Sequence, residues 1–203
     1  IDAIVDYLPC PTDIPPAKGL KFHKDESQEV EVPCDPSKMP LGLVFKIQYD
    51  REMGPLSYVR MYSGKISSGM QIYNLNKKKR ERVNRILRMH ADKSEAMDSL
   101  QAGDIAVIIG LKLAQTGDTI GTEAFNVLLE QPKFPQPVIS VALEPESMSE
   151  KDKMNETLEI LSREDPTFTS HEDAETGQLI ISGMGELHLD VLVTRMRDDF
   201  GVK

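Results

Sequence analysis

The chain has 203 residues, 28% of them charged and 39% hydrophobic, with a formal net charge of −9 at pH 7. This length suits one large domain or two small ones, and two cysteines are too few for a disulfide framework. No apolar run approaches the roughly 18 residues that span a bilayer, so we expect no membrane partner. The chain does not start with Met, which indicates a segment of a longer protein.

The first residues have the spacing of one helical face, with apolar side chains at Ile1, Ile4, Val5 and Leu8. Pro9 ends this helix, because proline removes a backbone donor and clashes with the preceding turn. From residue 10 to residue 40 the sequence is rich in Pro, Lys, Asp and Glu. This composition predicts a linker or an extended excursion.

A period of two begins at Leu41, which suits a strand with one buried face. The residues expected on that face are Leu41, Leu43, Phe45 and Ile47. Further short strands are expected over 56–63, 70–75, 82–89 and 105–110, most of them next to glycine-containing turns. Many short strands joined by such turns are typical of a closed or sandwiched all-β domain, which we assign to residues 41–131.

The proline-rich segment 131–137 is the clearest boundary in the chain. Beyond it the pattern predicts a strand over 138–143, a helix ending before Pro166, and strands over 167–171 and 179–182. A last helix buries one stripe, made of Leu189, Leu192, Val193, Met196 and Phe200. This order matches a split βαβ, or ferredoxin-like, α+β plait that lacks its last strand, which we assign to residues 132–203.

Motifs for catalysis and cofactor binding are absent. The sequence has no Gly-x-x-x-x-Gly-Lys-Ser/Thr phosphate loop. The four histidines, His23, His90, His171 and His188, have no cysteine or carboxylate at metal-ligand spacing. Glu186 and His188 are two residues apart and diverge on a helix. We therefore expect no catalytic residue, metal or cofactor in this chain.

Two segments call for interpretation. Residues 77–90 contain seven basic residues and one acid, which indicates either an RNA-facing edge or a solvated hairpin tip. Residues 181–190 place Gly183 and Gly185 between a strand and a helix. This pair is either an ordinary turn or a functional one, and we expect Gly185 to need a backbone shape or close approach that a Cβ would obstruct.

Collinear motifs settle which interpretation to prefer. Residues 180–190, 164–168 and 171–177 resemble the third domain of elongation factor G. Residues 60–66 with Gly69, 85–91 and 102–104 resemble its second domain, and residues 3–11 resemble the end of its GTPase domain. The chain is thus similar to the elongation factor G family of translational GTPases over nearly its whole length.

The resemblance implies a tail of the GTPase domain and linker over 1–40, a β-barrel second domain over 41–131 and a truncated ferredoxin-like third domain over 132–203. It implies a face toward the GTPase domain, where the inhibitor fusidic acid lodges in the family, formed by Asp165, Pro166, Thr167, Phe168, Gly183, Gly185, Glu186 and His188. Together with the basic segment, it implies contacts with ribosomal RNA by Arg60, Lys77, Lys78, Lys79, Arg80, Arg82, Arg85 and Arg88.

By the same resemblance, the whole protein binds GTP with Mg²⁺ and drives tRNA–mRNA translocation. Its expected partners are the small ribosomal subunit, through RNA and proteins, and its own GTPase domain. We expect a cytoplasmic monomer, with the mitochondrial matrix as the alternative location. Two other functions stay open: a paralogue for ribosome recycling or protection, and a stand-alone RNA-binding module, which would expose aromatic residues on the strands of the plait.

Overall fold

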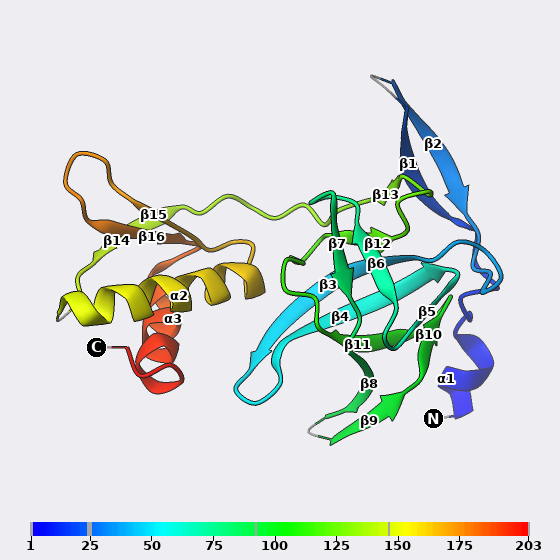
Figure 1. The fold of residues 1–203 in the computed structure, drawn as a ribbon, viewed down its shortest axis with the longest axis horizontal. Coiled ribbons are helices and arrows are strands. Elements are labelled where there is room, and N and C mark those ends of the chain that lie inside the picture. The colour runs from blue at the N-terminus through cyan, green and yellow to red at the C-terminus, as the bar shows by residue number, and fades with distance from the viewer. Residues whose placement is uncertain (1, 24–25, 92, 146, 203) are drawn as a thin grey trace. The chain divides into compact units, whose positions relative to one another are not determined.

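The computed structural model describes residues 2–23, 26–91, 93–145 and 147–202. The chain forms two units, Ile1–Pro132 and Lys133–Lys203 (Figure 1). At the start of the first unit, helix α1 spans Asp2–Tyr7, and Ile1 of the predicted helical face lies outside the described residues. The other three apolar residues of that face, Ile4, Val5 and Leu8, are 61–75% exposed. Within the described chain, this face is therefore uncovered.

The first unit contains an antiparallel eight-stranded sheet in the order β7-β6-β12-β3-β4-β11-β8-β9. A separate two-stranded pair joins β10 to β5. The bounds are β3 (Leu41–Asp50), β4 (Gly54–Ser63), β5 (Lys65–Ser67), β6 (Gln71–Asn74), β7 (Lys79–Arg82), β8 (Arg85–His90), β9 (Lys93–Met97), β10 (Ser99–Gln101), β11 (Ile105–Ile109) and β12 (Thr119–Gly121).

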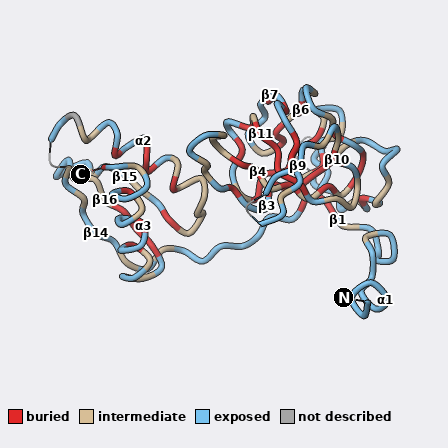
Figure 2. Tube along the Cα trace, turned by 90° about the horizontal axis from the view of Figure 1, so that it is seen from below, coloured by how far each residue is buried: buried red, intermediate tan, exposed pale blue. Residues whose placement is uncertain are grey.

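The sheet closes into a barrel through one bent segment. Strands β7 and β8 are separated only by Val83 and Asn84, and they pair with β6 and β11 respectively. The two joining residues continue both ladders, because the Val83 amide bonds to the Met70 carbonyl and the Asn84 amide to the Ile109 carbonyl. The enclosed core contains residues of β3, β4, β6, β8, β11 and β12, such as Val44, Val59, Ile72, Ile86, Ile108 and Ile120, together with Val83 of the joining segment. Figure 2 shows the buried stretches of the chain in red.

A β-bulge changes the alternation that we predicted for β3. The pairing with β4 shifts between Val44 and Lys46, so Phe45 is an extra residue without a partner of its own. Val44 and Ile47 consequently both enter the barrel core, while Phe45 is 37% exposed. The expectation that Phe45 shares a buried face with Ile47 is therefore wrong, because a bulge resets the period of two.

The segment that we interpreted as a linker contains a β-hairpin. Strands β1 (Ala17–His23) and β2 (Glu26–Val32) pair with each other, and β1 also pairs with β13 (Val127–Leu129). Val32, Val127 and Leu129 are buried in the small core that this sheet shares with Leu41 and Leu43. Only part of one face of the hairpin is covered, so charged residues are frequent in it. The sequence therefore lacks the clear alternation of apolar and polar residues that predicts a strand.

The second unit has the predicted order of strands and helices. It contains β14 (Ile139–Leu143), α2 (Met148–Glu164), β15 (Thr169–Glu172), β16 (Leu179–Gly183) and α3 (Glu186–Asp198). The sheet order is β14-β16-β15, all antiparallel, which is the split βαβ plait without its fourth strand. Met154, Leu158 and Leu161 of α2 pack with Leu189, Leu192 and Met196 of α3, over Ile181.

Among the described helices, none is long and apolar enough to span a membrane.

Candidate functional site

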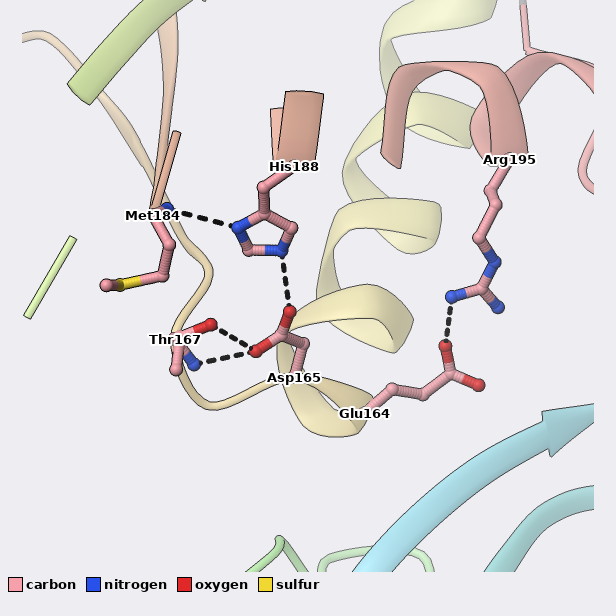
Figure 3. Close-up of polar contacts among 6 residues, drawn as sticks. All are labelled: Glu164, Asp165, Thr167, Met184, His188 and Arg195. Atoms are coloured by element: carbon pink, nitrogen blue, oxygen red, sulfur yellow. Dashed lines mark hydrogen bonds and ion pairs between the residues drawn. The ribbon is translucent and has the colours of Figure 1, made fainter. Parts of the chain in front are cut away.

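Two segments far apart in sequence meet in the second unit, at the end of α2 and the start of α3 (Figure 3). Asp165 ends α2, and its Oδ1 accepts hydrogen bonds from the amide of Thr167 at 2.8 Å and from the Thr167 hydroxyl at 2.6 Å. Its Oδ2 lies 2.7 Å from Nε2 of His188, in the first turn of α3. One carboxylate therefore holds the turn after α2 and the side chain of a second helix.

The tautomer of His188 follows from its other ring nitrogen. The backbone amide of Met184 donates to Nδ1 at 3.1 Å, so Nδ1 carries no proton. In the neutral ring Nε2 then carries the proton and donates it to Asp165. We name Asp165, Thr167, Met184 and His188 the α2–α3 lock.

The lock keeps the carboxyl of Asp165 ionised. Burial by itself raises the pKa of this group, but hydrogen bonds from the Thr167 hydroxyl and amide, and then from His188, outweigh burial and hold the pKa below its ordinary value. A carboxyl whose pKa is depressed in the folded state stabilises that state above the unfolded pKa of about 3.9, and this contribution is lost as pH falls through the folded pKa.

We expect Asp165→Asn to weaken the acid sensitivity of the second unit. The stability of the normal chain should fall between about pH 5 and pH 2, and the variant should show a smaller fall after starting from a lower stability at neutral pH. Urea unfolding, followed by hydrogen exchange of α2 and α3 amides, measures both quantities. Asp152→Asn, an exposed position on α2, is the matched control. Equal acid sensitivity of the Asp165 variant and the normal chain would refute this role.

A second tie between the two helices was not predicted. Nη1 of Arg195 on α3 lies 2.8 Å from Oε2 of Glu164, whose side chain is only 9% exposed. Burial lowers the pKa of Arg195, but Glu164 and Asp199 more than offset this and raise the pKa overall. No local spacing signals this pair, because Glu164 and Arg195 belong to different helices.

The two glycines of the turn have different roles from those we expected. A Cβ on Gly183 would lie 2.7 Å from Cδ2 of Leu189 and 2.9 Å from Nδ1 of His188. A Cβ on Gly185 would meet nothing within 4 Å, and Gly185 has φ 169°, an extended backbone open to any residue. The expectation that Gly185 is sterically required is wrong, and Gly183 is the glycine on which the ring of His188 packs.

The other predicted residues of this face do not all reach a surface. Phe168 is 2% exposed and packs in the core of the second unit. Pro166 is half-buried, and Glu186 is exposed as the first residue of α3. A pocket of about 280 Å³ in this unit is lined by none of the predicted residues but by Leu143, Glu144, Met154, Val193, Met196, Arg197 and Val202.

The lock resembles a catalytic relay in composition but not in connectivity. The Thr167 hydroxyl contacts Asp165, not the imidazole, and Nδ1 of His188 is occupied by an amide. A nucleophile activated by histidine must bond to that histidine. In the described part of the chain, no group of three or more His, Cys, Asp or Glu residues could hold a metal ion. The geometry therefore supports a structural role for the α2–α3 lock.

In the first unit, buried polar contacts fix the turn that carries Lys77–Lys79. Oδ2 of Asp118 accepts from Nδ2 of Asn74 and from the amide of Gln115, both at 2.9 Å. Oδ1 of Asn74 accepts from the amide of Lys77 at 2.9 Å, and the Lys77 ammonium donates to the side chain of Gln115. The turn is therefore anchored to the loop before β12.

The predicted basic residues are distributed over several surfaces. On β7, Arg80 and Arg82 are exposed, while Glu81 between them is buried and accepts from the Leu113 amide at 2.8 Å. Arg85 and Arg88 are three apart on β8, so they point to opposite faces of the sheet. Arg60 lies on β4. The stripe that we predicted from sequence is thus not one continuous surface.

The predicted cations also differ in their partners. Arg80 forms an ion pair with Glu123 at 2.7 Å, and this pair raises the pKa of Arg80. Lys78, Lys79 and Arg82 are exposed and form no ion pair with another described residue. These three cations, on and beside the anchored turn, are available to an anionic partner, and Arg85 and Arg88 of β8 are exposed as well.

Comparisons with known proteins match this fold and these segments. The family profile of elongation factor G domain 2 matches residues 39–123, and that of elongation factor G domain III matches residues 134–203. The chain belongs to the elongation factor G family. It is 66% identical to elongation factor G 1 of Treponema denticola and 60% identical to elongation factor G 2 of Treponema pallidum, each over all 203 residues.

The chain spans 29% of the length of these elongation factor G relatives. A crystal structure from Thermus thermophilus has a TM-score of 0.67 and 26% sequence identity, over 82% of this chain and 25% of that one. The α2–α3 lock lies within the domain III match and the basic segment within the domain 2 match. The chain thus contains consecutive regions that match two domains of elongation factor G.

Proposed function

We propose that this chain is the ribosome-binding, non-catalytic segment of an elongation factor G that promotes GTP-dependent translocation of tRNA and mRNA. The observation that carries the proposal is the match of two consecutive elongation factor G domains along one chain. GTP and Mg²⁺ would be bound by the rest of the protein, because the segment has no phosphate loop. We place the protein in the cytoplasm.

The first unit would supply the contact with small-subunit ribosomal RNA. Three of its exposed cations, Lys78, Lys79 and Arg82, stand on an anchored turn and an exposed strand. In a chain with a net charge of −9, such a local cluster attracts phosphates while the remaining surface does not. Positioning by phosphate contacts requires no base recognition.

The second unit would transmit the state of the GTPase domain. The α2–α3 lock fixes the turn of residues 183–185, and next to it Met184, Glu186 and Leu187 are exposed. A rigid turn with exposed apolar and acidic side chains suits a contact with another domain of the same protein. Strands β14, β15 and β16 contain no Phe, Tyr or Trp, which disfavours a stand-alone RNA-binding plait.

The test of the RNA contact is the salt dependence of binding to small-subunit ribosomal RNA. We expect the triple variant Lys78→Ala, Lys79→Ala and Arg82→Ala to bind more weakly and with a flatter dependence on salt. Each lost phosphate contact lowers the slope of log affinity against log salt by roughly 0.7–0.9. The control removes the same charge at three exposed lysines elsewhere, Lys21, Lys65 and Lys133. If the two triple variants behave alike, the anchored turn is not the contact.

A further inference from the structure

The outer face of β4 carries two tyrosine rings with an arginine between them, and the proposed function does not use these side chains. Val59 and Met61 point into the barrel core. The residues between and beside them, Tyr58, Arg60 and Tyr62, therefore share the opposite face of the strand, where all three are half-buried. Arg60 lies opposite Ile105 of β11, whose side chain is 55% exposed.

Strand β3 adds two side chains to this face at its bulge. Phe45 follows the inward Val44 and lies edge-on to Tyr58, with ring centroids 6.3 Å apart and planes at 60°. The register shift then keeps Lys46 on the same side, because Lys46 and not Phe45 lies opposite Tyr58. The ammonium of Lys46 lies 5.1 Å from the centre of the Tyr58 ring. Bulges of this kind re-aim side chains at binding sites. We name Phe45, Lys46, Tyr58, Arg60 and Tyr62 the stacking face.

At one end of the stacking face, Arg60 and Tyr62 line a pocket. The guanidinium carbon of Arg60 lies 5.1 Å from the centre of the Tyr62 ring. The remaining walls of this pocket, of about 100 Å³, are mostly apolar and include Ile14, Pro15, Pro16 and Val32. A stacked guanidinium presents its second flat side to whatever enters, and it carries a positive charge at the same place.

These features together fit one class of ligand. A nucleobase is flat and apolar on its faces, and its phosphate is anionic, so an unpaired nucleotide matches rings beside cations. A paired base offers no free face for stacking. We propose that the stacking face binds an unpaired nucleotide of RNA, with the base against Arg60 and Tyr62 and a phosphate near Lys46. This inference rests on the proposed function, because it takes RNA as the partner.

The test uses the whole chain and two RNA probes, a hairpin with 2-aminopurine in its unpaired loop and a perfect duplex with 2-aminopurine in a pair. We expect the hairpin to bind more tightly and its fluorescence to be quenched by stacking. Arg60→Lys keeps the charge but loses the flat stacking surface, and it should lower hairpin affinity roughly 5- to 150-fold, the range for loss of one stacked base. Arg197→Lys, the same exchange at an exposed position of α3 outside the predicted RNA contacts, should leave affinity and quenching unchanged.

The outcomes separate this inference from the proposed function. Arg60→Lys should leave the salt slope intact, whereas the Lys78, Lys79 and Arg82 triple variant should flatten the slope and leave the quenching. If the hairpin fluorescence is quenched but the triple variant does not change the salt slope, the anchored turn is not the phosphate contact, and the proposal for the stacking face stands. Equal binding of hairpin and duplex without quenching, or an Arg60→Lys variant that quenches as the normal chain does, would overturn the stacking face.

Discussion

Replacing Phe168 with alanine is expected to lower the free energy of unfolding of the second unit by about 3–5 kcal/mol, the usual cost of removing a buried phenyl ring. Phe168 is 2% exposed and packs in the core formed by α2, α3 and β16. Domains are stable by only about 5–15 kcal/mol, so much of the stability of this unit would be lost. Hydrogen exchange of α2 and α3 amides in the whole chain reports this unit separately from the barrel.

The matched control is another phenylalanine of the same unit. Phe134 is 37% exposed, so Phe134→Ala should change the stability of the unit by no more than about 0.5 kcal/mol. This pair also tests whether the side chain of Phe168 acts in the core or in the predicted face toward the GTPase domain. If Phe168→Ala kept full protection of the α2 amides and altered only contacts with another domain, Phe168 would be a surface residue and the observed core would be wrong.

The order of elements in the second unit could be predicted because each has a strong local signal. The stripe of α3 shows the spacing of a buried helical face, and Leu189, Leu192 and Met196 are buried as expected. Val193, from the same predicted stripe, is 39% exposed, because the covered face of α3 is narrower than its apolar spacing. Hydrophobic periodicity identifies which side of a helix is buried, but it does not show how wide a strip of that side the neighbouring elements cover.

The departures from prediction in the first unit arise from long-range pairing. The hairpin β1–β2 is held by β13, more than a hundred residues away in sequence, as in the pair of Gly19 with Leu129. The inward position of Ile47, three residues after the inward Val44, depends on the register of β3 with β4. A bulge leaves the composition of a strand unchanged, so the sequence of β3 alone reads as a regular alternation.

The α2–α3 lock shows the same limit at the candidate site. The segments around Asp165 and His188 both stand out in the sequence, but local spacing predicts no carboxylate partner for the histidine. The two residues are 23 positions apart, and they meet only because the β15–β16 hairpin returns the chain to the end of α2. The sequence thus identifies the two segments that form the α2–α3 lock, but only the fold of the plait brings Asp165 and His188 together.

Replacing Gly183 with serine is the second change with a large expected effect. The new Cβ would lie 2.9 Å from Nδ1 of His188 and 2.7 Å from Leu189, so the ring and the buried leucine would have to move. Overpacking of this kind costs about 1–3 kcal/mol. A movement of the ring would also break its bonds to Met184 and Asp165. In a unit of this size, each kcal/mol lowers the melting temperature by about 4–8 °C.

The same exchange at Gly185 is the control, since the two positions differ by two residues in one turn. Gly185 begins α3 in an extended conformation with open space around it, and serine is at least as good as glycine at the start of a helix. Gly185→Ser should therefore keep or slightly raise the melting temperature, and the ring nitrogen shifts of His188 should stay those of the Nε2–H tautomer. A Gly183→Ser chain that melts like the Gly185→Ser chain, with the same tautomer, would show that the close approach to His188 does not hold the lock together.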